Sequence, residues 1–432
     1  MLSIFEIVAL LLGLSAFFGW LNLRVLKLPH TIGLLVMAFA SSVMLIVAER
    51  LLPGLGIGET LKTAIEQIDL YTAIVNGMLA FLLFAGALHV DIDLMRGQKW
   101  AIGLMATIGV VISTAIVGVG IFLACRLVGF DMPLIWALVF GALISPTDPV
   151  AVLGLLKVVK VPEAIKGKIA GESLFNDGAA VVIFIALLTL ALGVPAGESV
   201  ESHWELGSIA TLFLFQAVGG IAFGLFTGWV AYRAMATIDD PMVEILISIA
   251  VCAVTYALSI RLHVSGPIAV VMTGLLIGGR GAEQAMSEKV KEYLFSFWAV
   301  VDEVLNSVLF LLIGLEVLVI GFHPQNSWMI LVAIPVVLFA RWVSVSIPIL
   351  LLSVRQTFSR GSIPILTWGG LRGGVSVALA LSLPPTDYKS IILTATFAVV
   401  IFSIIVQGLT VKWVIEKTSG TVVDEPEKLL VP

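Results

Sequence analysis

Long apolar segments recur through the whole chain and are separated by short polar loops. A helix needs about 20 predominantly apolar residues to cross the hydrocarbon core of a bilayer, and most of these segments have that length. Charged residues make up 12% of the chain, whereas a soluble domain contains roughly a quarter. The pattern therefore predicts an all-α polytopic membrane protein surrounded by a lipid bilayer, and it favours neither a soluble enzyme nor a nucleic-acid-binding protein.

Thirteen spans fit the apolar pattern, with boundaries good to a few residues. They are 2–23, 30–52, 70–90, 101–125, 133–156, 169–193, 206–232, 242–261, 264–279, 293–320, 327–353, 362–383 and 389–412. Of the 24 Lys and Arg residues, seventeen fall in one set of loops and the C-terminal tail, five in the opposite set, and Arg341 and Arg372 within spans. Because cytoplasmic loops are enriched in Lys and Arg, the N-terminus is expected outside and the C-terminus in the cytoplasm.

Two aspartates lie deep inside apolar spans. Asp148 and Asp177 are equally far along the chain from the centre of the basic loop 157–168. At about 1.5 Å per residue, each is expected on the order of 15 Å from the membrane surface, about mid-bilayer. Carboxylates at this depth are costly and by default mark an ion or proton site.

The spans 133–156 and 362–383 carry helix breakers at mid-membrane. Pro146 and Pro149 flank Asp148, and four glycines surround Arg372 in Gly369–Gly374. Paired interruptions seven spans apart indicate inverted repeats whose two interrupted helices cross at the substrate site. Half-helix ends carry partial charges, so we expect Asp148 to offset the N-terminal ends and Arg372 the C-terminal ends.

Asp177 is the predicted carrier of the transported ion. Ser173, Asn176 and Asp177 fall at i, i+3 and i+4, so they share one helix face. Burial favours the neutral form of a carboxyl group and a bound cation favours its charged form, so a proton and a cation compete. The hydroxyls of Thr147 and Ser173, with carbonyls freed near Asp148, would supply further oxygen ligands.

Other buried charges require partners. Glu172 points away from the Ser173 face, and the simplest hypothesis pairs it with Arg372 in a structural ion bridge. Arg341 either pairs with Glu316 or snorkels, and neither residue is given a transport role. Asp302 and Glu303 either line an entrance funnel for cations or form a solvated helix end. The five histidines and two cysteines form no ligand-spaced group, so no resident cofactor is expected.

Three motifs together resemble the monovalent cation/proton antiporter family, which includes NhaP-type and animal NHE exchangers. They are Ser145-Pro-Thr-Asp-Pro149, Glu172-Ser-Leu-Phe-Asn-Asp177 and Gly370-Leu-Arg-Gly-Gly374. The resemblance covers nearly the whole span region and implies an NhaA-like antiporter fold. It makes Asp177 the proton- and cation-binding residue, with Asp148, Thr147, Ser173 and Asn176 completing the site and Na⁺ held at Asp177, Thr147 and Ser173.

The resemblance also implies two domains, one for dimerisation and one for ion transport, and a homodimer in the cell (inner) membrane. Residues 1–90 and 242–320 would form the dimerisation domain, 101–193 and 327–412 the core domain, 206–232 a linker span and 413–432 a short cytoplasmic tail. The core would slide in an elevator motion. Asn176 resembles the electroneutral branch. Some relatives use an acidic ligand from the third span, where this chain has only Asn76 between Ala73 and Leu88.

The resulting expectation is a non-enzymatic antiporter that expels Na⁺ or Li⁺ for entering H⁺. A K⁺/H⁺ antiporter of the same fold is the nearest alternative, because no sequence feature sizes the cavity. A passive cation channel would need no proton-coupled carboxylate. An intramembrane aspartyl protease also needs two aspartates, but Asp177 lies in Asn-Asp-Gly rather than a Gly-x-Gly-Asp context.

Overall fold

The computed structural model describes residues 3–51, 74, 77–90, 92–148, 152, 163–193, 206–320, 327–354, 356, 358 and 361–419. Pro149, Asn76 and much of the basic loop 157–168 lie outside the described residues. Within these ranges every regular element is a helix, and the one β-type pairing is an isolated bridge between Asp148 and Leu371.

The first half of the chain forms a series of mostly apolar helices. They are α1 (Ile4–Leu21), η1 (Asn22–Leu26), α2 (His30–Leu51), α4 (Leu79–Leu88), α5 (Ile92–Leu104), η3 (Met105–Gly109), α6 (Val110–Val128), α7 (Leu134–Ile144) and α9 (Glu163–Leu192). The η elements are π-helical turns that continue the adjacent α-helix.

The second half contains the longest helix and the second interrupted span. Its elements are α10 (Leu206–Met235), α11 (Pro241–Arg261), α12 (Gly266–Leu276), η4 (Ile277–Gly281), α13 (Ala282–Ala285), α14 (Glu288–Ile320), α15 (Ser327–Leu352), α16 (Ser362–Trp368), α17 (Gly374–Leu381), α18 (Lys389–Phe402), η6 (Ser403–Gln407) and α19 (Gly408–Ser419).

The predicted all-α membrane fold is confirmed. Among the described residues, nine helices are long and apolar enough to cross a membrane, and three shorter apolar segments accompany them. Each predicted span contains at least one observed helix. The count of thirteen spans stays a prediction, as do the orientation and the division into core and interface.

Several helices extend beyond the predicted spans into polar sequence. The helix predicted from residue 101 begins at Ile92, α14 begins at Glu288 instead of 293, and the last span continues to Ser419, within the predicted tail. The reason is physical. Apolar residues mark only the part of a helix inside hydrocarbon, whereas backbone hydrogen bonding continues into the interface and beyond.

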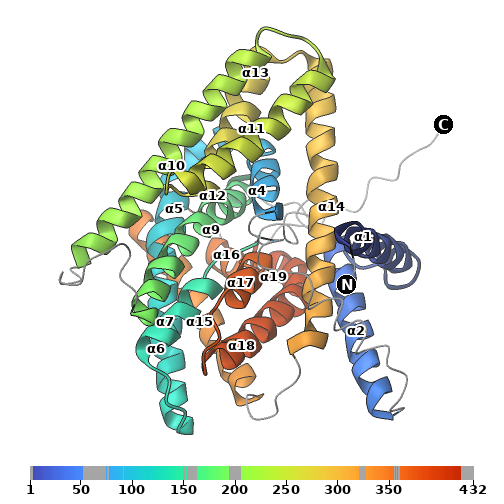
Figure 1. Ribbon diagram of the computed structural model, residues 1–432. Helices are drawn as coiled ribbons and strands as arrows, with labels where there is room; N and C mark the ends of the chain where they lie inside the picture. Colours follow the sequence, from blue (N-terminus) through green and yellow to red (C-terminus); the bar gives the residue numbers. More distant parts are fainter. Residues whose placement is uncertain are drawn as a thin grey trace.

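The buried side chains form two hydrophobic clusters, and α14 contributes to both. One cluster joins α1 and α2 with α6, α7 and α15 to α19, and it includes Phe310 of α14. The other joins α4, α10, α11 and α12, and it includes Trp298 of α14. In Figure 1, α14 runs through most of the height of the molecule, with α1 and α2 beside it. This helix therefore connects the two packed regions.

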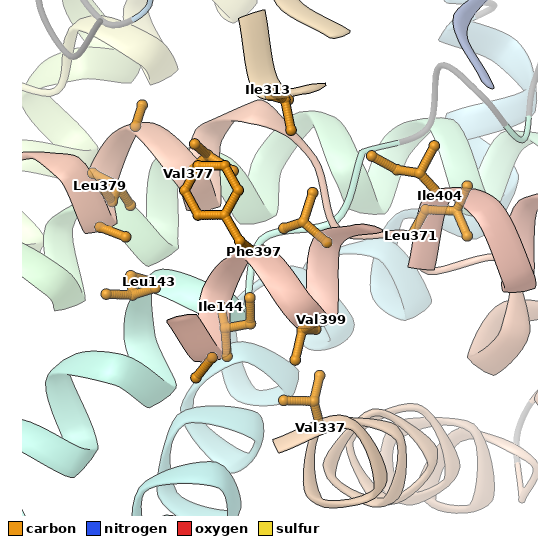
Figure 2. Packing of buried hydrophobic residues seen from close by; sticks show 14 of the residues in the cluster. Leu143, Ile144, Ile313, Val337, Leu371, Val377, Leu379, Phe397, Val399 and Ile404 are labelled. Carbon is orange, nitrogen blue, oxygen red and sulfur yellow. The ribbon is translucent and has the colours of Figure 1, made fainter. Parts of the chain in front are cut away.

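The two interrupted spans cross at their breaks, as predicted. The backbone N–H of Asp148, beyond the end of α7, donates to the carbonyl of Leu371 between α16 and α17 at 2.8 Å. Apolar side chains close the crossing. Figure 2 shows Ile144 at the end of α7 near Phe397 and Val399 of α18, and Leu371 farther along beside Ile404, all in the same buried cluster. The polar backbone of both breaks is therefore enclosed by protein, the condition for irregular backbone at membrane depth.

Candidate cation site

The first break begins where Pro146 ends α7. Ser145 is the C-terminal cap of the helix, and its hydroxyl lies 2.7 Å from the carbonyl of Gly141 and 2.9 Å from Ser113 Oγ. Proline lacks a backbone donor, so the helical hydrogen-bond pattern stops here. The carbonyls of Ser145 and Pro146 are thereby left available to other donors.

Arg372 supplies those donors from the second break. Its Nη1 donates to the carbonyls of Ser145 and Pro146, the latter at 2.9 Å, and its backbone N–H donates to Ser403 Oγ at 2.9 Å. The residue is buried. Arg372 thus lies at the C-terminal end of the opposite half-helix, a location compatible with the offsetting role predicted for it.

Asp148 lies at the N-terminal end of α17, the half-helix that follows the second break. Its carboxylate lies directly against Gly373, the N-terminal cap of α17, so closely that a side chain at Gly373 would collide with it. A carboxylate at a helix N-terminus interacts favourably with the positive end of the helix dipole. Asp148 therefore has the position that its predicted offsetting role requires.

A hydrogen-bonded network joins α9 to the first break. Thr147 Oγ1 lies 3.0 Å from Ser173 Oγ, and Asn176 Nδ2 donates to Thr147 Oγ1 at 2.6 Å. The Thr147 backbone N–H donates to Asn176 Oδ1 at 3.4 Å. All three side chains are buried. The predicted shared face of Ser173 and Asn176 is thus turned toward the break.

Asp177 lies one turn beyond Ser173, in the wall of a cavity of about 630 Å³. The side chains of Thr147, Asp148 and Ser173 line the same cavity. Asp177 is 8% exposed, so its carboxyl group is nearly removed from solvent. The structure therefore brings four of the predicted site residues together, and Asn176 is hydrogen-bonded to one of them, Thr147.

Further lining of the cavity comes from α14 and α4. Asp302, Glu303 and Asn306 of α14 and His89 at the end of α4 line it. Asn306 Nδ2 donates to Asp302 Oδ1 at 3.0 Å. The cavity also reaches Lys166, on the side that the Lys and Arg distribution assigns to the cytoplasm. Asp302 and Glu303 thus line the cavity, and Glu303 is also exposed, so the entrance funnel and the solvated helix end both stay open as predictions.

Glu172 has a different partner from the one predicted. Its carboxylate accepts from both terminal nitrogens of Arg341, with Arg341 Nη2 to Glu172 Oε2 at 2.9 Å, and both side chains are buried. Arg341 Nη2 also donates to the carbonyl of Leu366 at 3.0 Å. The predicted Glu172–Arg372 bridge is therefore wrong. The carbonyls of the first break occupy Arg372, and α15 brings Arg341 to Glu172 instead.

Sequence reasoning also missed Ser376, which lines the cavity from α17. A lone serine in an apolar helix is common and carries little information. The available signal was its position, just after the Gly373-Gly374 pair and therefore in the first turn of a half-helix.

Comparison with known proteins places these features in context. The chain matches the family described as "Sodium/hydrogen exchanger, transmembrane" over residues 13–417. It is 42% identical over 415 residues to the Na⁺/H⁺ antiporter NhaP of Pseudomonas aeruginosa, covering 94% of this chain and 95% of the relative. It is 36% identical over 381 residues to the Na⁺/H⁺ antiporter NhaH of Halobacillus aidingensis, covering 85% and 90%.

A solved structure has the same fold. The structure of the sodium proton antiporter MjNhaP1 from Methanocaldococcus jannaschii at pH 8 matches with a TM-score of 0.73, covering 96% of this chain and 98% of that one. The sequences are 20% identical, so this likeness concerns the fold alone.

Proposed function

The chain belongs to the sodium/hydrogen exchanger family, and we propose that it exchanges Na⁺ or Li⁺ for H⁺ across the membrane at Asp177. The observation that supports this most directly is a nearly buried carboxylate in the wall of a polar cavity, beside the hydroxyls of Thr147 and Ser173. Relatives at 42% and 36% identity are named Na⁺/H⁺ antiporters.

Competition for one carboxylate is the proposed mechanism. When Asp177 is protonated it is neutral, which suits its surroundings, and it has little attraction for a cation. When it is ionised, Na⁺ binds at its oxygens, and the Thr147 and Ser173 hydroxyls replace part of the hydration shell. Na⁺ and H⁺ need the same Asp177 oxygens, so the site holds one of them at a time. It therefore carries one ion outward and returns with the other.

This competition has a quantitative consequence. Under conditions where protons occupy most of the sites, each unit fall in pH raises the Na⁺ concentration needed for half-maximal exchange by about tenfold. The maximal rate at saturating Na⁺ should then change much less than the half-saturation constant. Asn176 carries no charge, so we propose one proton for one cation, an electroneutral exchange.

Alternating access would come from movement of one part of the molecule past the other. We propose that 101–193 and 327–412 form the moving core and that 1–90 and 242–320 form the dimer interface of a homodimer in the cell membrane. In support of this division, the cavity lining includes Asp177 from the proposed core and Asp302 from the proposed interface. In the present conformation it extends to the side assigned to the cytoplasm.

The test is exchange by the purified full chain in proteoliposomes with an imposed pH gradient. Na⁺, Li⁺ and K⁺ are tested in turn, with and without a potential clamp. We expect Na⁺ and Li⁺ exchange that ignores voltage and stops in Asp177→Asn. Exchange of K⁺ in preference to Na⁺ would support the alternative cation, and ion flux that survives in Asp177→Asn would indicate a channel.

A further inference from the structure

Ser376 has an unusual hydroxyl group. The residue is fully buried at 0% exposure, and its Oγ has no hydrogen-bond partner. A buried hydroxyl without a partner is costly, so buried polar side chains are nearly always paired. An unpaired one calls for an explanation, such as an ion or water that binds there.

The local fold explains why Ser376 lacks the usual partner. A serine inside a helix commonly donates to the carbonyl four residues earlier, as Ser145 does to Gly141 and Thr396 to Ile392. Ser376 lies in the first turn of α17, which begins at Gly374 after the extended residue Gly373. There is no preceding helical turn, so no carbonyl is presented to this hydroxyl.

The side chain belongs to the ion cavity. Ser376 lines it together with Thr147, Asp148, Ser173 and Asp177. The residue three positions earlier, Gly373, touches the Asp148 carboxylate. Ser376, with its unpaired hydroxyl, is therefore part of the same cavity lining as the two carboxylates.

We propose that the Ser376 hydroxyl is an additional oxygen ligand of the transported cation, contributed by the second interrupted span. Thr147 and Ser173 already share a hydrogen bond with each other, and Asn176 donates to Thr147. A small monovalent cation prefers several oxygen ligands, and the free lone pairs of Ser376 are available for it. This inference rests on the proposed exchange at Asp177.

The arrangement would give the cation ligands from three elements. Asp177 and Ser173 come from α9, Thr147 from the first break, and Ser376 from the half-helix after the second. The crossing would then do more than hold two backbone breaks together. It would set the distance between oxygens on opposite sides of the ion.

Binding to the purified full chain tests this without transport. The variants are Ser376→Ala, Ser376→Thr, Asp177→Asn and the control Ser346→Ala, in detergent at alkaline pH. Ser346 is also buried with an unpaired hydroxyl, but it lies in α15 outside the cavity lining. The readouts are radioactive Na⁺ binding and the rise in melting temperature with added Na⁺, which follows from binding to the folded state only.

We expect Ser376→Ala to weaken Na⁺ binding by about tenfold, the low end of the range for loss of a supporting group at an ion site. Without Na⁺ the variant should melt no lower than wild type, because removing an unpaired buried hydroxyl is not destabilising. Ser376→Thr should retain binding, and Ser346→Ala should bind as wild type does.

The outcomes separate the two proposals. If wild type binds no Na⁺, or Asp177→Asn binds as well as wild type, the proposed function fails and this inference with it. If wild type binds and Asp177→Asn does not, but Ser376→Ala binds equally well, only the inference fails. It fails too if Ser346→Ala shows the same loss, or if Ser376→Ala melts lower in the absence of Na⁺.

Discussion

Glu172 and Arg341 should be strongly coupled in stability. Their side chains are 2% and 7% exposed and share two parallel hydrogen bonds, so each charge depends on the other for compensation. Removing one member of such a buried pair typically costs about 3–5 kcal/mol, because the remaining charge stays buried without a partner. We therefore expect Glu172→Gln and Arg341→Met each to destabilise the protein by about that amount.

The double variant should lose far less than the sum. With both charges gone, what remains lost is chiefly the hydrogen bond from Arg341 to the Leu366 carbonyl, worth about 1 kcal/mol. The coupling energy should then exceed about 2 kcal/mol, within the range measured for residues in direct contact.

Thermal unfolding of the detergent-solubilised protein measures this. At about 1–2 °C per kcal/mol for a chain of this size, each single variant should melt roughly 3–10 °C below wild type. The double variant should melt above both single variants, because it loses only about 1 kcal/mol. A second cycle with Glu172→Gln and Arg372→Gln is the control, since Arg372 contacts backbone carbonyls instead. Additive effects in the first cycle, or equal coupling in the second, would refute the assigned pairing.

Three further variants test the crossing and the carboxylate beside it. Gly373→Ala should abolish or strongly reduce exchange in proteoliposomes, because its Cβ would collide with the Asp148 carboxylate. The control Gly103→Ala has open space around its Cβ and should be neutral. Equal activity of the two variants would contradict the packing. Arg372→Gln leaves the buried carbonyls of Ser145 and Pro146 short of donors and should cost about 2–4 kcal/mol, measured by thermal unfolding, with melting at the wild-type temperature as the contrary result. Asp148→Asn should impair folding or exchange more than Asp148→Glu, because only the glutamate keeps a negative charge at the start of α17. Expression level and exchange rate measure this. Equal behaviour of the two variants would count against the role.

Much of this architecture follows from local chemistry. Pro146 removes a backbone donor, and the Gly369–Gly374 segment weakens a helix, so both breaks can be located without knowing the fold. The expectation that Arg372 lies at the C-terminal half-helix ends came from the partial charges of those ends. Asp177 could be singled out as a candidate because a carboxylate in an apolar span by default marks an ion or proton site.

The identity of the ion pair could not be predicted in the same way. Glu172 had two candidate partners inside spans, Arg341 and Arg372, and both side chains are long enough to reach several neighbours. Which arginine reaches it depends on how α15 is rotated against α9, and on the competing carbonyl acceptors at the first break. Neither is encoded in local spacing. Ser376 was missed for a related reason, because its hydroxyl is informative only when its missing partner is known.

The contacts across the crossing also limit how the molecule could open. The Asp148 N–H, the Leu371 carbonyl and Nη1 of Arg372 each form hydrogen bonds with the opposite break. Pulling α7 away from α17 would strand these groups in a dry interior, at a cost comparable to the stability of a whole domain. A gate hinged at that point is thus disfavoured. We expect the two interrupted spans to move together as one rigid body. The interface that changes during opening would then be the one between these two spans and the helices α4 and α14, which line the cavity.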